Sequence, residues 1–490
     1  MGLSAIILTI NKKSTSKILF QIVSILLLLV SCNSTVELET DWELQLRKDL
    51  ATLKISNFPD VKFNILDYAN KITSSAIQKT IDLCNSKGGG VVLIPKGIYN
   101  DIGKIVLKSN VRLHFETGTV INFSRDKKDF LPMVLTSWEG NDVYNFSSFI
   151  YADGQENIAI TGNAKLNGNG SKDNWWNWKD KSLPVPDRQE NHPDIRPRLL
   201  KQNRDNAPVQ DRKYGIDSKL RPYFMTLRNC KNVYIEGITL TNSPMWNIHP
   251  LMSENIIIDS VTIISPNNSP NTDGINPESS KNIVIKNSVI SVGDDCVAIK
   301  SGRNNDGRKR EMPSENIWIK NCTFANGHGG IVIGSELSGG VRNVLIEDCD
   351  MSSPNLLRAL RIKSNEYRGA YVENIIMRNT KIDTIGGPIV GINMDYKSYA
   401  TEKTDKKYYT SCNNILVENI ECNFANQGWL INGSEILPIG NITFKNWDVK
   451  NIKYGIHHRN IERLLLEDIN LEAEGAMARL TKKDIFQKKQ

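Results

Sequence analysis

The sequence predicts an all-β fold, a right-handed single-stranded parallel β-helix with a short capping helix near its N-terminus. Two observations predict it. A short phrase led by Asn recurs with apolar residues at every second position, and the tightest copies, at Asn232, Asn255 and Asn282, begin 23 and 27 residues apart. The spans between copies show no helical periodicity. The copies are NIAITGNAKL from Asn157, NVYIEGITL from Asn232, NIIIDSVTI from Asn255, NIVIKNSVI from Asn282, NIWIKNCTF from Asn316, NVLIEDCDM from Asn343, NIIMRNTKI from Asn374, NILVENIEC from Asn414 and NITFKNWDV from Asn441.

Each copy is predicted to form short strands with one buried face, because apolar alternation with period two is the strand pattern. A unit this small cannot bury its own face, so the copies must stack, and a stacked coil of this length with two or three strands is a parallel β-helix. A leucine-rich repeat and a β-propeller are disfavoured, since neither the LxxLxL consensus nor a four-strand blade signature occurs. The leading Asn suits a left-handed turn, and stacked Asn side chains are expected to form a hydrogen-bonded ladder.

The first sixty residues divide into a predicted export signal and a predicted tether. A basic stretch over residues 12–17 precedes an apolar run to Ser31 that is too short for a comfortable membrane span. The ending LVSC resembles a bacterial lipobox, so we expect Cys32 to be acylated; an ordinary signal peptide that contains a Cys is the alternative. We therefore expect a lipoprotein signal over 1–31 and a tether over 32–60.

The folded body is predicted to span residues 61–475. The segment SSAIQKTIDLCNSKGGG from Ser74 predicts an amphipathic helix that ends at glycines and caps the solenoid. A polar insert between Ser182 and Pro222, with a Trp cluster before it, is expected to be irregular and functional. Residues 476–490 are expected to be a solvated basic tail.

Charge and cysteine content exclude several classes of protein. Removal of residues 1–31 takes away three lysines and lowers the formal charge from +7 to +4, and no long basic run with interleaved aromatics points to nucleic acid. Of eight cysteines none forms a CxxC pair, so structural zinc is not indicated. Most are expected to be free core thiols, with Cys322 and Cys349 stacked inside and Cys412 with Cys422 the pair to test for a disulfide.

Three aspartates occupy related positions in consecutive coils. Asp273 and Asp294 are 21 residues apart, about one coil, so they should lie one above the other at a strand spacing of about 4.8 Å. Asp295 would face the opposite way in a regular strand, but Gly293 permits a bend that leaves both exposed to one site. Such carboxyl groups repel one another, so at least one should stay protonated near neutral pH. Paired acid and base carboxyls are what glycosidic cleavage needs, whereas each Asp alone would be an ordinary turn residue.

Further polar groups follow in the next coils. His328 lies between two glycines, and Arg361 and Lys363 alternate in a strand, which sends both cations to one face. A uronate carboxylate would suit the space between them, although a solvated basic face explains them equally well.

The motifs NTDG, GDD, GHG and RIK, in that order, resemble glycoside hydrolase family 28, the polygalacturonases. The stretches SPMWNIHP, CVAIKSGRNNDGR and RALRIKSN are similar to the bacterial, exo-polygalacturonase-like branch, and the likeness covers about residues 60 to 470. The resemblance implies inverting hydrolysis of α-1,4 bonds between galacturonate residues, without metal or organic cofactor. It implies Asp294 as general acid, Asp273 and Asp295 as the pair that activates water, His328 as support for the acid, Arg361 and Lys363 as carboxylate-binding residues, Tyr396 (with Tyr399 as fallback) as a further site residue, and Asn271 as a substrate contact or turn residue.

Several alternatives stay open on sequence alone. Exo action is slightly favoured over endo action, because the insert and the Trp cluster would close one end of a groove. A calcium-dependent pectate lyase, a rhamnogalacturonan-directed enzyme and a non-catalytic polysaccharide-binding β-helix are the rival functions. The expected partner is a pectic polysaccharide or oligogalacturonide, with no nucleic acid and no membrane contact except the lipid. We expect a monomer, in the periplasm or anchored to the outer membrane of a Gram-negative bacterium.

Overall fold

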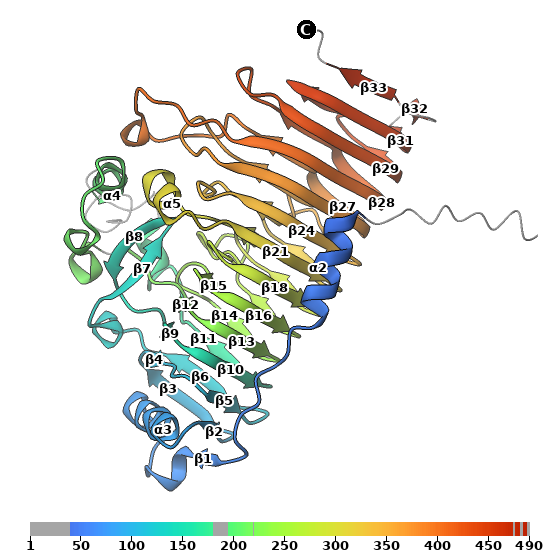
Figure 1. Ribbon diagram of the computed structural model, residues 1–490. Helices are drawn as coiled ribbons and strands as arrows, with labels where there is room; N and C mark the ends of the chain where they lie inside the picture. Colours follow the sequence, from blue (N-terminus) through green and yellow to red (C-terminus); the bar gives the residue numbers. More distant parts are fainter. Residues whose placement is uncertain (1–39, 180–194, 219, 474–475, 481–483, 488–490) are drawn as a thin grey trace, which may run out of the picture. The chain divides into compact units, whose positions relative to one another are not determined.

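Parallel strands stacked coil upon coil form the protein (Figure 1). The computed structural model describes residues 40–179, 195–218, 220–473, 476–480 and 484–487. The signal segment and Cys32 lie outside the described residues. The chain divides into two compact units, Met1–Gln45 and Leu46–Gln490, and the second holds the β-helix.

Three ladders of parallel strands run along the β-helix, which confirms the predicted fold class. The first ladder contains three N-terminal strands, followed by the Asn-led strands from β10 onward: β1 (Lys62–Asn64), β2 (Gly90–Ile94), β5 (Val111–Phe115), β10 (Glu156–Gly162), β13 (Lys231–Glu236), β16 (Glu254–Asp259), β18 (Lys281–Lys286), β21 (Ser314–Lys320) and β24 (Val341–Glu347). The second contains β3 (Ile98–Ile102), β6 (Val120–Phe123), β11 (Lys165–Asn167), β14 (Thr239–Thr241), β17 (Thr262–Ile264), β19 (Val289–Ser291), β22 (Thr323–Asn326) and β25 (Asp350–Ser353).

The third ladder carries the residues of the candidate site. Its strands are β4 (Ile105–Val106), β9 (Ile150–Asp153), β12 (Met225–Arg228), β15 (Ile248–Leu251), β20 (Asp295–Ile299), β23 (Gly329–Ile333) and β26 (Leu360–Lys363). The later coils are joined into long bent strands, which run through two or three ladders: β27 (Tyr371–Asn393), β28 (Ser411–Asn432), β29 (Ile439–Ile452) and β31 (Ile461–Ala473), with β30 (His457–Arg459) beside β28.

The predicted asparagine ladder forms along one corner of the coils. Asn232, Asn255 and Asn282 adopt φ values of 56°, 58° and 57°, the left-handed region that Asn tolerates. Each side-chain amide donates to the Asn oxygen of the preceding coil, with Asn255 to Asn232 at 3.0 Å and Asn282 to Asn255 at 3.1 Å. The same bond continues from Asn157 to Asn414, and this chain of amides fixes the register of the strands that follow each turn.

Apolar residues of the three ladders fill one continuous core, in which isoleucines stack coil after coil. The described cysteines are buried free thiols, as expected for most of them, and Cys412 and Cys422 form no disulfide. The predicted cap is α3 (Ser74–Ser86): the Thr73 hydroxyl accepts a hydrogen bond from the backbone N–H of Ala76, and Ile77 and Ile81 are buried.

Two expected boundaries differ in the structure. The segment predicted as a tether contains α2 (Asp41–Ala51), because Leu46 and Leu50 form an apolar stripe that is buried. Arg47 donates to Glu347 at 2.7 Å, and its guanidinium lies 5.4 Å from the Trp318 ring centroid. The predicted solvated tail contains β32 (Ala476–Leu480) and β33 (Asp484–Gln487), which pair antiparallel with β31 and so cover part of its open edge.

The remaining elements are short. They are the hairpin β7 (Val134–Trp138) and β8 (Asn141–Asn145), the helices α4 (Ile195–Arg204) and α5 (Asn304–Arg310), and 3₁₀ turns at Ile65–Asp67, Lys127–Phe130, Trp176–Lys179, Val209–Asp211, Gly215–Asp217 and Ala400–Glu402. In Figure 1, α4, α5 and the β7–β8 hairpin lie together on one flank of the coils. Within the described ranges, no helix combines the length and the hydropathy that a bilayer crossing demands.

Candidate active site

The third ladder brings the sequence-predicted residues together around one pocket of about 320 Å³. The residues come from successive coils, since Asp295 begins β20, His328 precedes β23, and Arg361 and Lys363 lie in β26. Asp295 pairs in register with Gly329 of the next coil. All eight predicted residues line the pocket: Asn271, Asp273, Asp294, Asp295, His328, Arg361, Lys363 and Tyr396. The fallback Tyr399 lines it too.

Gly293 permits the bend that turns two adjacent aspartates toward one pocket. A Cβ at Gly293 would lie 2.2 Å from the backbone oxygen of Ser269, so only glycine fits this close approach. The turn places the Asp294 backbone oxygen 2.9 Å from the His328 N–H of the next coil. The expected departure from strand alternation at Asp294 and Asp295 is thereby explained.

Asp273 is buried, and its carboxyl group has few hydrogen-bond partners in the protein. One of its carboxyl oxygens accepts a hydrogen bond from Asn276 at 2.9 Å, and the other has no partner among the described residues. Burial, followed by the nearby charge of Asp294, raises the pKa of Asp273 well above its usual range. Asp273 is therefore the aspartate on which the structure favours the proton.

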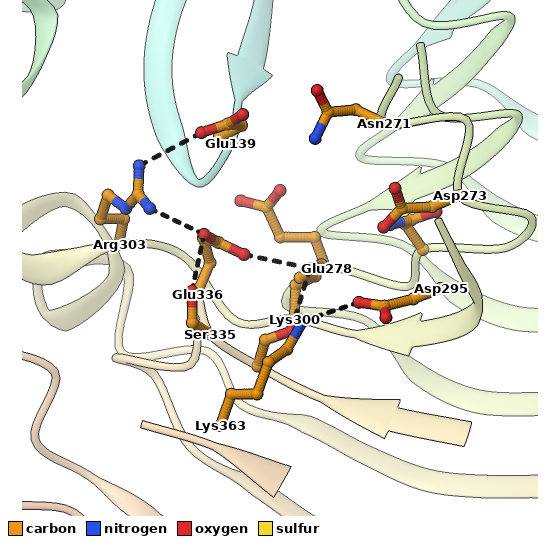
Figure 2. Close-up of polar contacts among 12 residues, drawn as sticks. Glu139, Asn271, Asp273, Glu278, Asp295, Lys300, Arg303, Ser335, Glu336 and Lys363 are labelled. Carbon is orange, nitrogen blue, oxygen red and sulfur yellow. Dashed lines mark hydrogen bonds and ion pairs between the residues drawn. The ribbon is translucent and has the colours of Figure 1, made fainter. Parts of the chain in front are cut away.

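Asp295 is equally buried but has cationic partners. Its carboxylate accepts from the Lys363 ammonium at 2.7 Å (Figure 2). The Arg361 guanidinium lies 3.4 Å away. Burial alone would raise the pKa of Asp295, but the charges of Lys363 and Arg361 outweigh burial and hold that pKa below its usual range. Asp295 is thus ionised, as a base must be, while Asp273 favours its neutral form.

Asp294 is more open to solvent than the other two aspartates, and it contacts a histidine. Its Oδ1 lies 3.0 Å from Nδ1 of His328, and the side-chain amide of Asn271 lies 3.5 Å from its Oδ2. The bond to Asp294 is the main cause that raises the pKa of His328, and burial opposes it. The pocket therefore has a partly exposed carboxyl with a histidine positioned behind it.

The sequence predicts a substrate carboxylate between Arg361 and Lys363, and the structure places a different anion there. Arg361 and Lys363 do lie on one face, but the anion between them is Asp295 of the protein itself. The Tyr396 ring centroid lies 5.8 Å from the Arg361 guanidinium and 5.7 Å from the Lys363 ammonium. Arg361 is the more exposed cation of the two, at 15% against 8%, and so is better placed to meet a ligand.

A network of buried charges forms the wall opposite these cations, and sequence reasoning missed it. Glu336 accepts from Lys300 at 3.0 Å and from Arg303 at 2.8 Å, and Arg303 lies 3.4 Å from Glu139 (Figure 2). The cations outweigh burial and hold the pKa of Glu336 well below its usual range. Lys300 directly follows five buried residues of β20, which is a signal that sequence reading could have used. Glu139 lies in a hairpin turn outside the repeat, so no periodicity indicates it.

The Trp cluster does not close the groove, contrary to the expectation. Trp175 and Trp178 are buried beside Phe146, with ring centroids 5.9 and 6.2 Å away, and Trp176 donates to the Ser243 backbone oxygen. Large aromatic side chains gain more from core packing than from exposure. Part of the polar insert, residues 180–194, lies outside the described residues.

Arg196 of α4 is the insert's described contribution to the pocket. Its guanidinium is ion-paired with Glu139 and lies 4.6 Å from the ring centroid of Tyr399. The insert thus reaches the pocket through a salt bridge and a cation–π contact rather than through the tryptophans.

One group of ligand atoms has the spacing of a metal site. Donor atoms of Asp294, Asp295 and His328 lie within 4.8 Å of one another. Two of these groups already bond to each other, and Lys363 holds the third, so a cation would have to displace an ammonium ion. These two carboxyl groups and the histidine therefore suit acid and base catalysis of hydrolysis better than they suit the binding of a metal ion.

Comparison with known proteins gives consistent matches. The family model for glycosyl hydrolases family 28 matches residues 207–464, more than half of the chain. A probable polygalacturonase of Vitis vinifera is 31% identical over 66% of the chain, and an exo-poly-alpha-D-galacturonosidase of Dickeya chrysanthemi is 29% identical over 73%. These alignments cover 59% and 62% of the relatives, so the chain spans about six-tenths of their length. The solved structure of a hyperthermoactive exopolygalacturonase from Thermotoga maritima superposes with a TM-score of 0.79 at 31% identity, over 91% of the chain and all of the relative.

Proposed function

The chain belongs to family 28 of the glycosyl hydrolases, and on this premise we propose that it hydrolyses α-1,4 bonds between galacturonate residues in polygalacturonate, with inversion at the reacting carbon. One observation carries the proposal. Burial and the charge of Asp294 favour a proton on Asp273, while Lys363 and Arg361 keep Asp295 ionised one coil away. An inverting glycosidase needs an ionised base and a separate acid carboxyl in one pocket, and Asp294 is the carboxyl left for the acid role.

Asp294 is proposed as the general acid. The charge of Asp294 is one cause of the raised pKa of Asp273, so the two carboxyls lie close enough to interact. Asp294 is the more exposed of the two and can present a proton to the glycosidic oxygen, with the bond to His328 orienting its carboxyl. After proton transfer, the carboxylate on Asp294 is stabilised by His328, whose pKa is raised by this same contact.

Asp295 and Asp273 are proposed to activate the attacking water, with ionised Asp295 as the base and neutral Asp273 as the group that positions the water. Asp295 is already ionised before the reaction, as a base must be. The hydrogen bond from Lys363 orients its carboxylate. Arg361 remains within reach of a substrate carboxylate, with Tyr396 beside it and Asn271 across the pocket. Water attacks the anomeric carbon as the glycosidic bond breaks, the leaving oxygen takes the proton from Asp294, and the base takes the proton from water.

Exo action on chain ends is proposed over endo action. The Thermotoga and Dickeya relatives carry exo-acting names, and the first aligns along its whole length. Arg196, Glu139 and Tyr399 crowd one side of the pocket, which favours a chain end over a continuous polymer.

Export, acylation at Cys32, monomeric state and a periplasmic or outer-membrane location are also proposed, and they rest on the sequence alone.

The test is to incubate the purified full-length chain with polygalacturonate in two parallel reactions, one with calcium and one with excess chelator. Reducing ends, ultraviolet absorbance and chromatography of the products are followed together. Saturated monogalacturonate as the sole early product supports exo hydrolysis, and a ladder of oligomers supports endo hydrolysis. Unsaturated products that disappear with chelator would contradict hydrolysis, and a lack of any product would contradict activity on this polymer.

A further inference from the structure

A second, smaller pocket of about 170 Å³ adjoins the candidate site on its C-terminal side. It shares Arg361, Lys363 and Tyr396 with the main pocket. Its other wall comes from the next coils, because Arg361 pairs with Gly391 of β27, and Gly391 pairs with Leu430 of β28. The groove therefore continues past the proposed catalytic residues onto the next coils. Each coil adds one strand spacing, about 4.8 Å.

Arg358 is a cation of this pocket that no described carboxylate contacts directly, although the charge of Asp295 offsets part of its burial. It is half-buried, and within the described part of the chain no hydrogen bond or ion pair engages its guanidinium. The described residues that line the pocket include no carboxylate. Burial first, and then the neighbouring charge of Arg361, lower the pKa of Arg358 to about 10. A half-buried cation without an anion is costly, and an anionic ligand would remove that cost.

The chain is shaped around this side chain. The side chain of Arg358 passes over Gly391 of the next coil, where a Cβ would lie 2.8 Å from its Cδ and Nε, so the absence of a side chain at Gly391 leaves room for it. The backbone oxygen of Arg358 also accepts from the Gly330 N–H at 2.8 Å, which anchors the residue at its base. The Arg358 side chain thus lines the pocket beside Gly391.

We propose that this pocket binds the carboxylate of a further galacturonate unit, one unit beyond the unit that Arg361 contacts, and that Arg358 recognises it. This inference rests on the proposed function. A guanidinium fork matches a carboxylate in bidentate geometry, and the side-chain amides of Asn393 and Asn432 line the same pocket for sugar hydroxyls. A methyl-esterified unit offers no charge to Arg358, so the pocket selects the free acid.

The experiment compares kcat/KM for trigalacturonate and digalacturonate, since only the trimer has a unit to place in this pocket. Arg358→Gln is expected to lower the trimer-to-dimer ratio of kcat/KM about tenfold, the size of one charge-assisted hydrogen bond. Arg358→Lys keeps the positive charge but loses the bidentate geometry of the guanidinium, so it should lower the trimer-to-dimer ratio by about threefold. Arg463→Gln changes an exposed arginine outside both pockets and should leave the ratio at the wild-type value.

The outcomes separate this inference from the proposed function. An unchanged ratio in Arg358→Gln, with a wild type active on both oligomers, overturns the role of Arg358 and leaves the hydrolase proposal standing. If the wild type cleaves neither oligomer, the proposed function fails and this inference with it. If circular dichroism shows that Arg358→Gln does not fold, Arg358→Lys carries the test, and an unchanged ratio there is the overturning result.

Discussion

The ammonium of Lys363 lies 2.7 Å from the carboxylate of Asp295, and both side chains are almost fully buried. The pair spans 68 residues of sequence but only two coils of the helix. The sequence associates Lys363 with substrate, but in the structure its charge keeps Asp295, the proposed base, ionised. The expected consequences follow for activity, pH dependence and stability.

Asp294→Asn is expected to lower kcat by at least about 100-fold while the fold is kept, because an amide cannot donate the proton that the leaving oxygen needs. Reducing-end assays on polygalacturonate measure the loss, and circular dichroism checks the fold. Asp448→Asn, on an exposed face away from the pocket, is the matched control and should keep wild-type rates. Near-wild-type activity in Asp294→Asn would contradict its assignment as the acid.

Lys363→Met is expected to shift the acidic limb of the pH–kcat/KM profile to higher pH. The variant removes the largest of the favourable charges on Asp295, so burial is less opposed and its pKa rises. Asp295 must be ionised to act as a base, so activity should then be lost at a higher pH than in the wild type. Lys363→Arg keeps the charge and should shift the limb less. An acidic limb that does not move in Lys363→Met would exclude Asp295 as the base.

Glu278→Gln is expected to destabilise the protein by about 3–5 kcal/mol at neutral pH, since Glu278 is buried between Arg310 at 2.5 Å and His249 at 3.0 Å. Burial alone would raise the pKa of Glu278, but the Arg310 charge outweighs it and lowers the pKa to about 2. Because the folded pKa is depressed, this contribution is fully present above the unfolded value of about 4.3 and is lost as the pH falls through about 2.

Urea unfolding at pH 6 and at pH 3 measures this difference. The gap between wild type and Glu278→Gln should be smaller at pH 3. Glu254→Gln, which breaks partly exposed ion pairs to Lys231 and Lys281, is the control and should cost no more than about 1 kcal/mol. A gap that stays constant between the two pH values would contradict the linkage.

Asn282→Ala is expected to destabilise the protein by about 2–3 kcal/mol. The variant loses the amide bonds to Asn255 and Asn316 and places alanine at a φ of 57°. Asn282→Gly tolerates that φ and loses only the bonds, so it should cost less. Denaturant midpoints of the two variants separate the hydrogen bonds from the backbone term, and equal midpoints would show that backbone strain contributes nothing.

The sequence was sufficient for the repeat and for most of the pocket. Asn232 and Asn255 mark the strands because a ladder residue must recur at every coil, and Asp273 and Asp294 fall together because they are one coil apart. Sequence reasoning failed where the chain leaves the repeat. Trp175 was expected at the groove and is buried, and Glu139 was not expected at all, since a hairpin turn carries no periodic signal.

What the sequence by itself determined is the set of groups that share the pocket, because stacking converts a fixed spacing along the chain into proximity in space. Only the tertiary structure decided what each group does there. Burial without a cation favours the proton on Asp273, and two cations remove it from Asp295, although both are aspartates one coil apart. The physical reason is that a carboxyl's pKa depends on desolvation and on charges within a few ångströms, and those distances exist only after the coils have stacked.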